Sequence, residues 1–364
     1  MDNNEYKYLI WLAHVQGIGA ANLERLLKFF GSAENLYKAN AADAQILTEN
    51  ALARFRTAQK NINPEKCAEL MEQKRIRFIH KSQNEYPELL KDIPSAPFGL
   101  FVRGEMPDFD KKWVNIIGSR KHSKYGSDTA YSLAGELSKE DIVIVSGMAD
   151  GLDSWAHKGV LDNGGLTVAV LGCGIDVCYP KSNEKLYRTI MEKGAIISEY
   201  PPGTSPNKWQ FPARNRIMSG LCHATLVIEA AIASGTAITV DCALDQGREV
   251  LAVPGNITSP FSGGTNLMIK QGAHVATCAA DVMDVLGIIK NANEYSFNEE
   301  IHKIEDIPLA PNEKTVYALL GNEPMDLEYI IMESGLDYRN AAVALTNLEI
   351  GGRIRKLPGQ RFVR

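Results

Sequence analysis

The sequence predicts an α/β protein built on a doubly wound, mostly parallel β-sheet, with a helical region before it and a small winged-helix domain after it. Short β-branched and apolar runs alternate with stretches of helical spacing between residues 78 and 288. Several runs are apolar at every position, as strands buried on both faces of a parallel sheet must be. The chain has 364 residues, enough for two or three domains. Strands and helices alternating in this way predict an extended Rossmann-like sheet.

Residues 1–75 are predicted to be helical, because apolar residues recur at helical spacing in 9–13 and again in 23–30. Between these stripes lies Val15-Gln16-Gly17-Ile18-Gly19. An apolar residue between two glycines resembles the hairpin of helix-hairpin-helix DNA-binding modules, in which backbone N–H groups approach a phosphate. A plain turn between two helices explains the same five residues equally well.

The central region is predicted to form strands at residues 114–117, 142–145, 167–171, 195–198, 225–228 and 250–253. The intervening stretches 126–139 and 181–193 have helical spacing. Together they define a predicted Rossmann-like domain over residues 78–288.

The C-terminal part is predicted to be a separate small domain. Residues 289–311 are polar, contain prolines and are interpreted as a linker. Three short helices are predicted at 313–320, 327–333 and 339–349, and a basic strand-turn-strand follows at 353–364, turning at Pro358-Gly359. This order predicts a winged-helix domain at 312–364. Such domains bind duplex DNA in some proteins and other proteins elsewhere, and the sequence does not choose between these uses.

Composition sets limits on function. The chain is 45% hydrophobic and 23% charged, which is typical of a globular protein. Its net charge of −5 requires any nucleic-acid site to be a local basic patch. The chain has no long uncharged apolar run and no basic-then-apolar start, so we expect a cytoplasmic protein without a membrane span.

The six cysteines form no Cys-x-x-Cys pair, so they are interpreted as buried reduced thiols. Cys222-His223 is interpreted as a packed cysteine beside a surface histidine rather than a ligand pair. We expect no metal site and no cofactor.

Glycine-rich loops follow nearly every predicted strand. They include Gly118-Ser119-Arg120, Ser146-Gly147 and Gly172-Cys173-Gly174, with Gly264-Thr265-Asn266 beyond the last strand. The carboxyl ends of parallel strands meet at one edge of a sheet, where ligands bind. Glycine allows close approach, and its backbone N–H can face an anion. The pattern therefore predicts a phosphate-binding surface.

The usual nucleotide motifs are missing from this surface. The chain has no Gly-Lys dipeptide, and Gly172-x-Gly174 is followed by Val177 where a third glycine would stand. An extended nucleic-acid backbone therefore fits the row of loops better than a dinucleotide or a nucleoside triphosphate.

Residues 208–216 combine cations with aromatic residues. No acidic residue lies between Glu199 and Glu229. Single-strand binders pair a basic groove with stacking platforms. Phe211 is interpreted equally well as a base platform or as a core residue, whereas for Trp209 packing on the sheet is the favoured interpretation.

Several motifs, in order, resemble those of the DprA/Smf family over residues 85–285: Gly-Ser-Arg at 118–120, Ser-Gly-Met-Ala-Asp-Gly-Leu-Asp at 146–153, Ala-Val-Leu-Gly-x-Gly-x-Asp-x-x-Tyr-Pro at 169–180, Ser-Glu-Tyr-Pro-Pro-Gly-Thr at 198–204, Phe-Pro-Ala-Arg-Asn-Arg-Ile-Met-Ser-Gly at 211–220, Gly-Arg at 247–248, Ala-Val-Pro-Gly at 252–255 and Gly-Thr-Asn at 264–266. The resemblance implies a single-stranded DNA-binding protein that dimerises through its Rossmann-like domain. It also implies that the protein binds the RecA recombinase and helps load it on incoming DNA during natural transformation.

By position in these motifs, Arg120 matches a DNA-contacting basic residue of the family, and Lys208, Phe211 and Arg214 lie in a segment that supplies further contacts. Lys181, after Tyr179-Pro180, is a further candidate. The full candidate set for nucleic-acid binding is Gly118, Ser119, Arg120, Ser146, Gly147, Lys181, Lys208, Phe211, Arg214, Asn215, Arg216, Gly264, Thr265 and Asn266.

The main rival hypothesis is a Rossmann-like nucleotide phosphoribohydrolase-type enzyme. Such chemistry needs a carboxylate within hydrogen-bond reach of the bond that breaks. The candidate carboxylates are Asp150, Asp153, Glu199, Glu229 and Asp241. We favour structural roles: a helix N-cap for Asp153, and ion pairing with arginines for Glu199 and Glu229. We therefore assign no catalytic residue. A scaffold that binds partners but not DNA is the third possibility.

Overall fold

The computed structural model describes residues 3–40, 47–288, 309–321, 324–351, 353–357 and 359–364. It divides into two compact units, residues 1–290 and 291–364. Each unit is described by itself.

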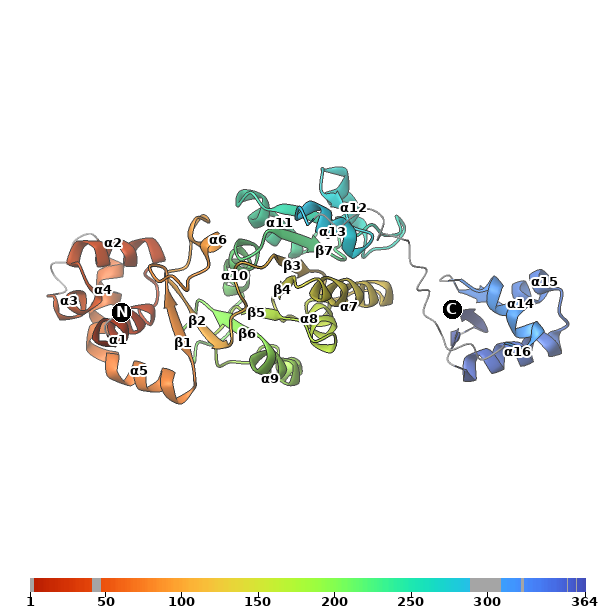
Figure 1. Cartoon of the computed structure of the whole chain (residues 1–364), viewed down its shortest axis with the longest axis horizontal. Coiled ribbons are helices and arrows are strands. Elements are labelled where there is room, and N and C mark those ends of the chain that lie inside the picture. The colour runs from red at the N-terminus through yellow and green to blue at the C-terminus, as the bar shows by residue number, and fades with distance from the viewer. Residues whose placement is uncertain (1–2, 41–46, 289–308, 322–323, 352, 358) are drawn as a thin grey trace. The chain divides into compact units, whose positions relative to one another are not determined.

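The first unit begins with helices: α1 (Asn3–Ala13), α2 (Ala20–Phe30), α3 (Ala33–Lys38), α4 (Glu49–Asn61) and α5 (Pro64–Gln73). Ser32, Thr48 and Asn63 start the last three of these helices, because each side chain accepts a hydrogen bond from a first-turn amide. The core of these helices continues into sheet residues such as Phe101. Figure 1 shows the five helices gathered at the β1–β2 end of the sheet.

The sheet within the described residues has nine strands in the order β1-β2-β6-β5-β4-β3-β7-β8-β9. The strands are β1 (Arg77–His80), β2 (Gly99–Gly104), β3 (Trp113–Ile117), β4 (Val143–Ser146), β5 (Thr167–Leu171), β6 (Ala195–Ser198), β7 (Ala224–Val227), β8 (Glu249–Ala252) and β9 (His274–Val275). Strands β3 to β9 run parallel, and β1 and β2 are antiparallel additions at one edge. The predicted mostly parallel sheet is confirmed, and all six predicted strands lie within one residue of the observed ones.

Helices cover both faces of this sheet and bury one apolar core on each side. They are α6 (Glu88–Lys91), α7 (Lys124–Lys139), α8 (Leu152–Asp162), α9 (Glu184–Lys193), α10 (Gln210–Gly220), α11 (Thr236–Asp245), α12 (Gly263–Lys270) and α13 (Ala279–Val285). The predicted helix at 181–193 is divided into a 3₁₀ turn at Lys181–Asn183 and then α9. None of the described helices is long and apolar enough to cross a membrane.

The second unit contains α14 (Pro311–Leu319), β10 (Met325–Asp326), α15 (Leu327–Ser334), α16 (Tyr338–Ile350), β11 (Arg355–Leu357) and β12 (Arg361–Val363). Its antiparallel sheet has the order β10-β12-β11, and its helices bury a separate core. The predicted winged-helix domain is confirmed. The predicted linker lies outside the described residues as far as residue 308, and so does the wing residue Pro358. The predicted domain boundaries stay predictions.

Each of the six cysteines is free. Burial raises the pKa of Cys67 to about 11 and that of Cys173 to about 12. Cys222 is buried, as predicted, whereas His223 is half-buried rather than on the surface and accepts a hydrogen bond from the Trp113 amide. Cys278 is exposed, so the expectation of a buried thiol is wrong there.

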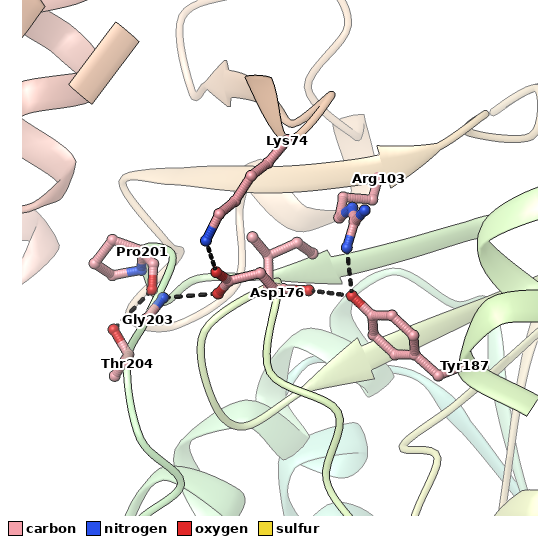
Figure 2. A network of polar contacts seen from close by, with 8 residues as sticks. Lys74, Arg103, Asp176, Tyr187, Pro201, Gly203 and Thr204 are labelled. Atoms are coloured by element: carbon pink, nitrogen blue, oxygen red, sulfur yellow. Dashed lines mark hydrogen bonds and ion pairs between the residues drawn. The ribbon is translucent and has the colours of Figure 1, made fainter. Parts of the chain in front are cut away.

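A polar network ties the N-terminal helices to the loops at the carboxyl edge of the sheet. Asp176 lies between Lys74, just beyond α5, and the backbone of Gly203 (Figure 2). The Lys74 Nζ to Asp176 Oδ2 distance is 2.5 Å, and the Gly203 amide donates to Asp176 Oδ1 at 2.7 Å. Burial by itself would raise the pKa of Asp176, but Lys74 and the Gly203 amide hold it below 3.8.

We predict that Asp176→Asn lowers the free energy of unfolding at pH 7 by about 1–2 kcal/mol, because hydrogen bonds to a charged group are lost. The pKa of Asp176 is lower in the folded state than in the unfolded chain. This stabilisation is therefore fully present when the pH is above the unfolded pKa, and it disappears as the pH falls through the folded pKa. Urea denaturation at pH 7 and pH 3 measures both effects. Glu184→Gln, in the exposed pair with Arg188, is the control and should change stability little. A gap between Asp176→Asn and the wild type that stays constant with pH would contradict the assignment.

Candidate nucleic-acid interface

A groove of about 760 Å³ lies at the carboxyl edge of the sheet. The loop after β3 forms one wall, with Gly118, Ser119 and Arg120. The start of α10 and the start of α11 form much of the rest. The sequence predicted this position, because parallel strands bring their following loops to one edge.

The accessible charges of the groove are positive. Arg120, Lys121 and Lys208 line it and are exposed. Among the described residues that line the groove, the one acidic side chain is Asp153, which is only 6% exposed. The groove therefore presents a cationic surface despite the net charge of −5 of the whole chain.

Two aromatic rings lie together at one side of the groove. Phe211 is half-buried and Tyr179 is 40% exposed, and their ring centroids are 5.4 Å apart. Phe211 packs on Gly172, where an added Cβ would come within 2.8 Å of the ring. Tyr179 is not among the residues predicted for the site, although its position after a glycine-rich strand end was a usable signal.

Arg214 does not present its guanidinium to solvent, which corrects its predicted role. The residue is 5% exposed. Its Nη1 donates to the carbonyls of Gly147 at 2.8 Å and Val170 at 2.5 Å. Its Nε donates to Oδ1 of Asn215 at 3.2 Å. This bond engages the side-chain oxygen of Asn215, which is also a predicted site residue. Arg214 therefore joins α10 to the loop that follows β4 and to strand β5.

Asp153 is a second buried ionisable residue near this arginine, and the two charges interact electrostatically. Its carboxylate accepts hydrogen bonds from the amides of Gly147 at 3.2 Å and Ala149 at 3.4 Å. Burial raises the pKa of Asp153, while Arg214 and these amides oppose the shift. Gly151, not Asp153, is the N-cap of α8, so the predicted capping role is wrong. Asp153 instead fixes the glycine-rich loop.

The loop amides predicted to face phosphates are used inside the protein. The Ser119 amide donates to the Glu229 carbonyl at 2.9 Å, and the Gly264 amide donates to the Ala230 carbonyl at 2.7 Å. The Gly147 amide is the one that contacts Asp153. These three amides hold the loops in place, while the cationic side chains of Arg120, Lys121 and Lys208 are exposed in the groove.

Three more candidates have structural roles, which corrects their assignment. Ser146 is fully buried and its Oγ donates to the Ile116 carbonyl at 2.7 Å. Thr265 is also fully buried, with its Oγ1 donating to Ser262. The Asn266 amide both donates to and accepts from the backbone of Gly255. These contacts close the loops against the strand ends.

Arg216 and Trp209 lie outside the groove. Arg216 Nη2 donates to both oxygens of Glu199, at 2.6 and 2.7 Å, which confirms the predicted pairing of that glutamate. Trp209 is 66% exposed, so the favoured interpretation that it packs on the sheet is wrong. Lys181 is exposed and does not line the groove. Its neighbour Pro180 lines a small hollow next to the groove.

The remaining candidate carboxylates are mostly engaged in structure. Glu229 is buried and accepts hydrogen bonds from the amide and the Oγ of Ser123, so its predicted arginine partner is wrong. Asp150 accepts a hydrogen bond from Ser182. Asp241 is exposed on α11. Among the described residues, no group of three or more His, Cys, Asp and Glu side chains is placed to hold a metal ion.

The fold and groove define a class: a Rossmann-like protein whose sheet edge carries a cationic, aromatic-lined groove suited to an extended anion. The chain belongs to the DNA recombination-mediator protein A family, also called DprA/Smf, whose model matches residues 77–287. The model of the DprA winged helix domain matches residues 305–360.

Similar proteins agree with this assignment. Protein Smf of Escherichia coli is 34% identical over 332 residues, covering 88% of this chain and 87% of its own. DNA processing protein DprA of Streptococcus pneumoniae is 43% identical over 198 residues, covering 54% of this chain and 70% of its own. Its solved structure superposes with a TM-score of 0.66 at 34% identity, covering 76% of this chain and 97% of that one. A structure of the Helicobacter pylori protein, described for its single-stranded DNA binding mode, gives a TM-score of 0.53 at 28% identity, covering 58% of this chain and 95% of that one.

The two predicted DNA-contacting arginines should differ sharply in what they contribute to stability. We predict that Arg214→Ala lowers the free energy of unfolding by about 3–5 kcal/mol, because the carbonyls of Gly147 and Val170 lose their donor and the buried charge of Asp153 loses the nearby cation that offsets it. Arg120→Ala should leave stability nearly unchanged, because the side chain is exposed. Urea denaturation of both variants makes the comparison. Equal stability of the two variants would show that the buried role of Arg214 is wrong.

Proposed function

We propose that this protein binds single-stranded DNA in the groove at the carboxyl edge of its sheet. The observation that carries the proposal is the combination of exposed Arg120, Lys121 and Lys208 with the Phe211–Tyr179 pair. Cations attract phosphates, and aromatic rings stack unpaired bases. The Helicobacter pylori relative, described for a single-stranded DNA binding mode, supports the same ligand.

In the proposed mode the three exposed cations contact phosphates and Phe211 stacks a base. A base must be unpaired to lie on a ring in this way, so the site favours single strands over duplex. The groove binds through side chains rather than through the three internally bonded loop amides. Long lysine and arginine side chains can follow phosphates whose spacing varies, as those of a flexible single strand do.

We propose that the protein is not an enzyme. The carboxylates that a nucleotide hydrolase would use have other partners: Asp153 with loop amides, Glu199 with Arg216 and Glu229 with Ser123. No observation on the described residues favours the hydrolase or the scaffold over the DNA-binding proposal.

We predict that Arg120→Glu and Lys208→Glu each weaken binding of a labelled oligo-dT strand at least about tenfold, because a phosphate contact becomes a repulsion. Each lost contact should reduce the slope of log affinity against log salt by about 0.7. Phe211→Ala should weaken binding with little change of slope, because stacking releases no counterions. Fluorescence anisotropy at several salt concentrations measures all three.

The matched control is Lys139→Glu. Lys139 is exposed at the end of α7, while the groove lies at the start of that helix, about 22 Å away for 16 residues. It should bind like the wild type. Failure of the folded wild type to bind oligo-dT would overturn the proposed function.

We also propose that the protein forms a homodimer through its Rossmann-like domain. Within the described residues, β9 is the edge strand at this end of the sheet, and Val275 on it is 45% exposed. Leu244 on α11 and Leu267 on α12 are 60% and 40% exposed. Figure 1 shows α11 and α12 at the end of the sheet away from the N-terminal helices. An open edge with exposed apolar side chains is a surface that another chain can cover.

Leu267→Glu and Val275→Glu should convert a dimer to a monomer, because a charge in an apolar interface loses its hydration without a partner. Sedimentation equilibrium measures the mass. Ile350→Glu, at an 81% exposed apolar position of the other unit, is the control and should stay dimeric. A monomeric wild type, or dimeric forms of both variants, would contradict this surface.

The family description supports a further proposal, that the protein hands its bound strand to the RecA recombinase in the cytoplasm during transformation. A recombinase assay on oligo-dT covered by single-strand-binding protein tests this step. Faster recombinase-dependent ATP hydrolysis in the presence of the wild type is expected, and no acceleration would overturn it.

A further inference from the structure

A second cavity, of about 480 Å³, lies on the other side of α10 from the groove. Its floor and walls come from the 15–19 hairpin, from Arg54 on α4, and from the loop and helix start at 199–216. The N-terminal helices and the Rossmann-like sheet belong to one compact unit, so the cavity is a feature of that unit.

The start of α10 separates the two hollows. Lys208 and Phe211 line the groove, whereas Trp209, Ala213 and Arg216 line the second cavity. Residues 209, 213 and 216 recur at helical spacing and so share one face of the helix. Lys208 and Trp209 are adjacent in sequence. A DNA strand bound at Lys208 in the groove is therefore only one residue away from Trp209 in the second cavity.

The cavity contains groups suited to a nucleotide. Trp209 is 66% exposed, and its ring stands edge-on to Tyr200, with 6.0 Å between centroids and 82° between planes. Arg54 is exposed and its guanidinium lies against Gly17. The Nη1 of Arg216 has no hydrogen-bond partner, although Nη2 is paired with Glu199. An exposed indole, an exposed guanidinium and an unpaired buried donor thus line the same space.

The walls of this cavity are held in place without a ligand. Gly17 has φ +78°, a conformation that other residues rarely adopt, so the hairpin needs glycine there. On the opposite wall, Thr204 Oγ1 donates to the Pro201 carbonyl at 2.7 Å, and Asp176 holds Gly203 (Figure 2). A preformed site loses less entropy when its ligand binds.

We propose that this cavity is a second subsite for the same single-stranded DNA, in which Trp209 stacks a base and Arg54 contacts the adjacent phosphate. The inference rests on the proposed function, because it continues the strand that the groove binds. Strands long enough to cross α10 occupy both hollows, and shorter strands occupy the groove alone.

The test is anisotropy of an oligo-dT series from about 4 to about 20 nucleotides, a range that spans known single-strand site sizes. Trp209→Ala should leave the affinity for the shortest strands unchanged and reduce that for the longest by about fivefold or more. Arg54→Ala should lower the salt slope by about 0.7 for long strands only. Arg120→Glu should weaken binding at every length.

Two control variants accompany the series: Arg56→Ala, an exposed arginine on the same helix as Arg54, and Phe29→Ala, an aromatic residue 62% exposed on α2. Neither lines the cavity, so both should bind like the wild type. Equal losses for Trp209→Ala at all lengths, or no loss at any length, would overturn the second subsite. The proposed function fails separately, if the wild type does not bind or if Arg120→Glu has no effect.

Discussion

The buried charges of Arg214 and Asp153, which both bond to Gly147, are the constraint on which the edge of the sheet depends. Each charge is unfavourable in the interior by itself, and the two charges offset each other electrostatically. Arg214 joins the carbonyls of Gly147 and Val170, and Asp153 joins the amides of Gly147 and Ala149. Gly147 therefore contacts both partners, one through its carbonyl and one through its amide. Helix α10, strand β5 and the loop after β4 are fixed relative to one another by two side chains.

This arrangement changes what the edge can bind. In a dinucleotide-binding sheet, glycine-loop amides hold the pyrophosphate. Here the Asp153 carboxylate accepts the hydrogen bond of the Gly147 amide, while the amides of Ser119 and Gly264 donate to backbone carbonyls. The exposed cations of the groove are the side chains Arg120, Lys121 and Lys208, which in the proposed function bind the anion. Flexible cations do not demand one fixed phosphate geometry, which is the property that a single strand of variable conformation requires.

Helix α10 lies between the groove and the second cavity. Its two faces line two hollows, and the half-buried Phe211 and the exposed Trp209 are two positions apart at its start. The N-terminal helices contribute to the second hollow because their core continues into the sheet, and because Lys74 pairs with Asp176 at the loop edge. The helical region is thereby part of the wall of a cavity rather than only an appendage.

The sequence by itself determined the sheet and the place of its site. Parallel strands buried on both faces are apolar throughout, and the loops after them must meet at one edge, so both features were readable from local pattern. Short strands such as β9, two residues long, carry too little pattern to be predicted. The cationic segment 208–216 was identified, but not the direction of its side chains. Residues 214 and 216 lie about 200° apart around a helix, so one enters the protein and the other pairs with Glu199. Only the tertiary structure decided which cations face solvent, because burial and partners depend on strands and loops distant in sequence.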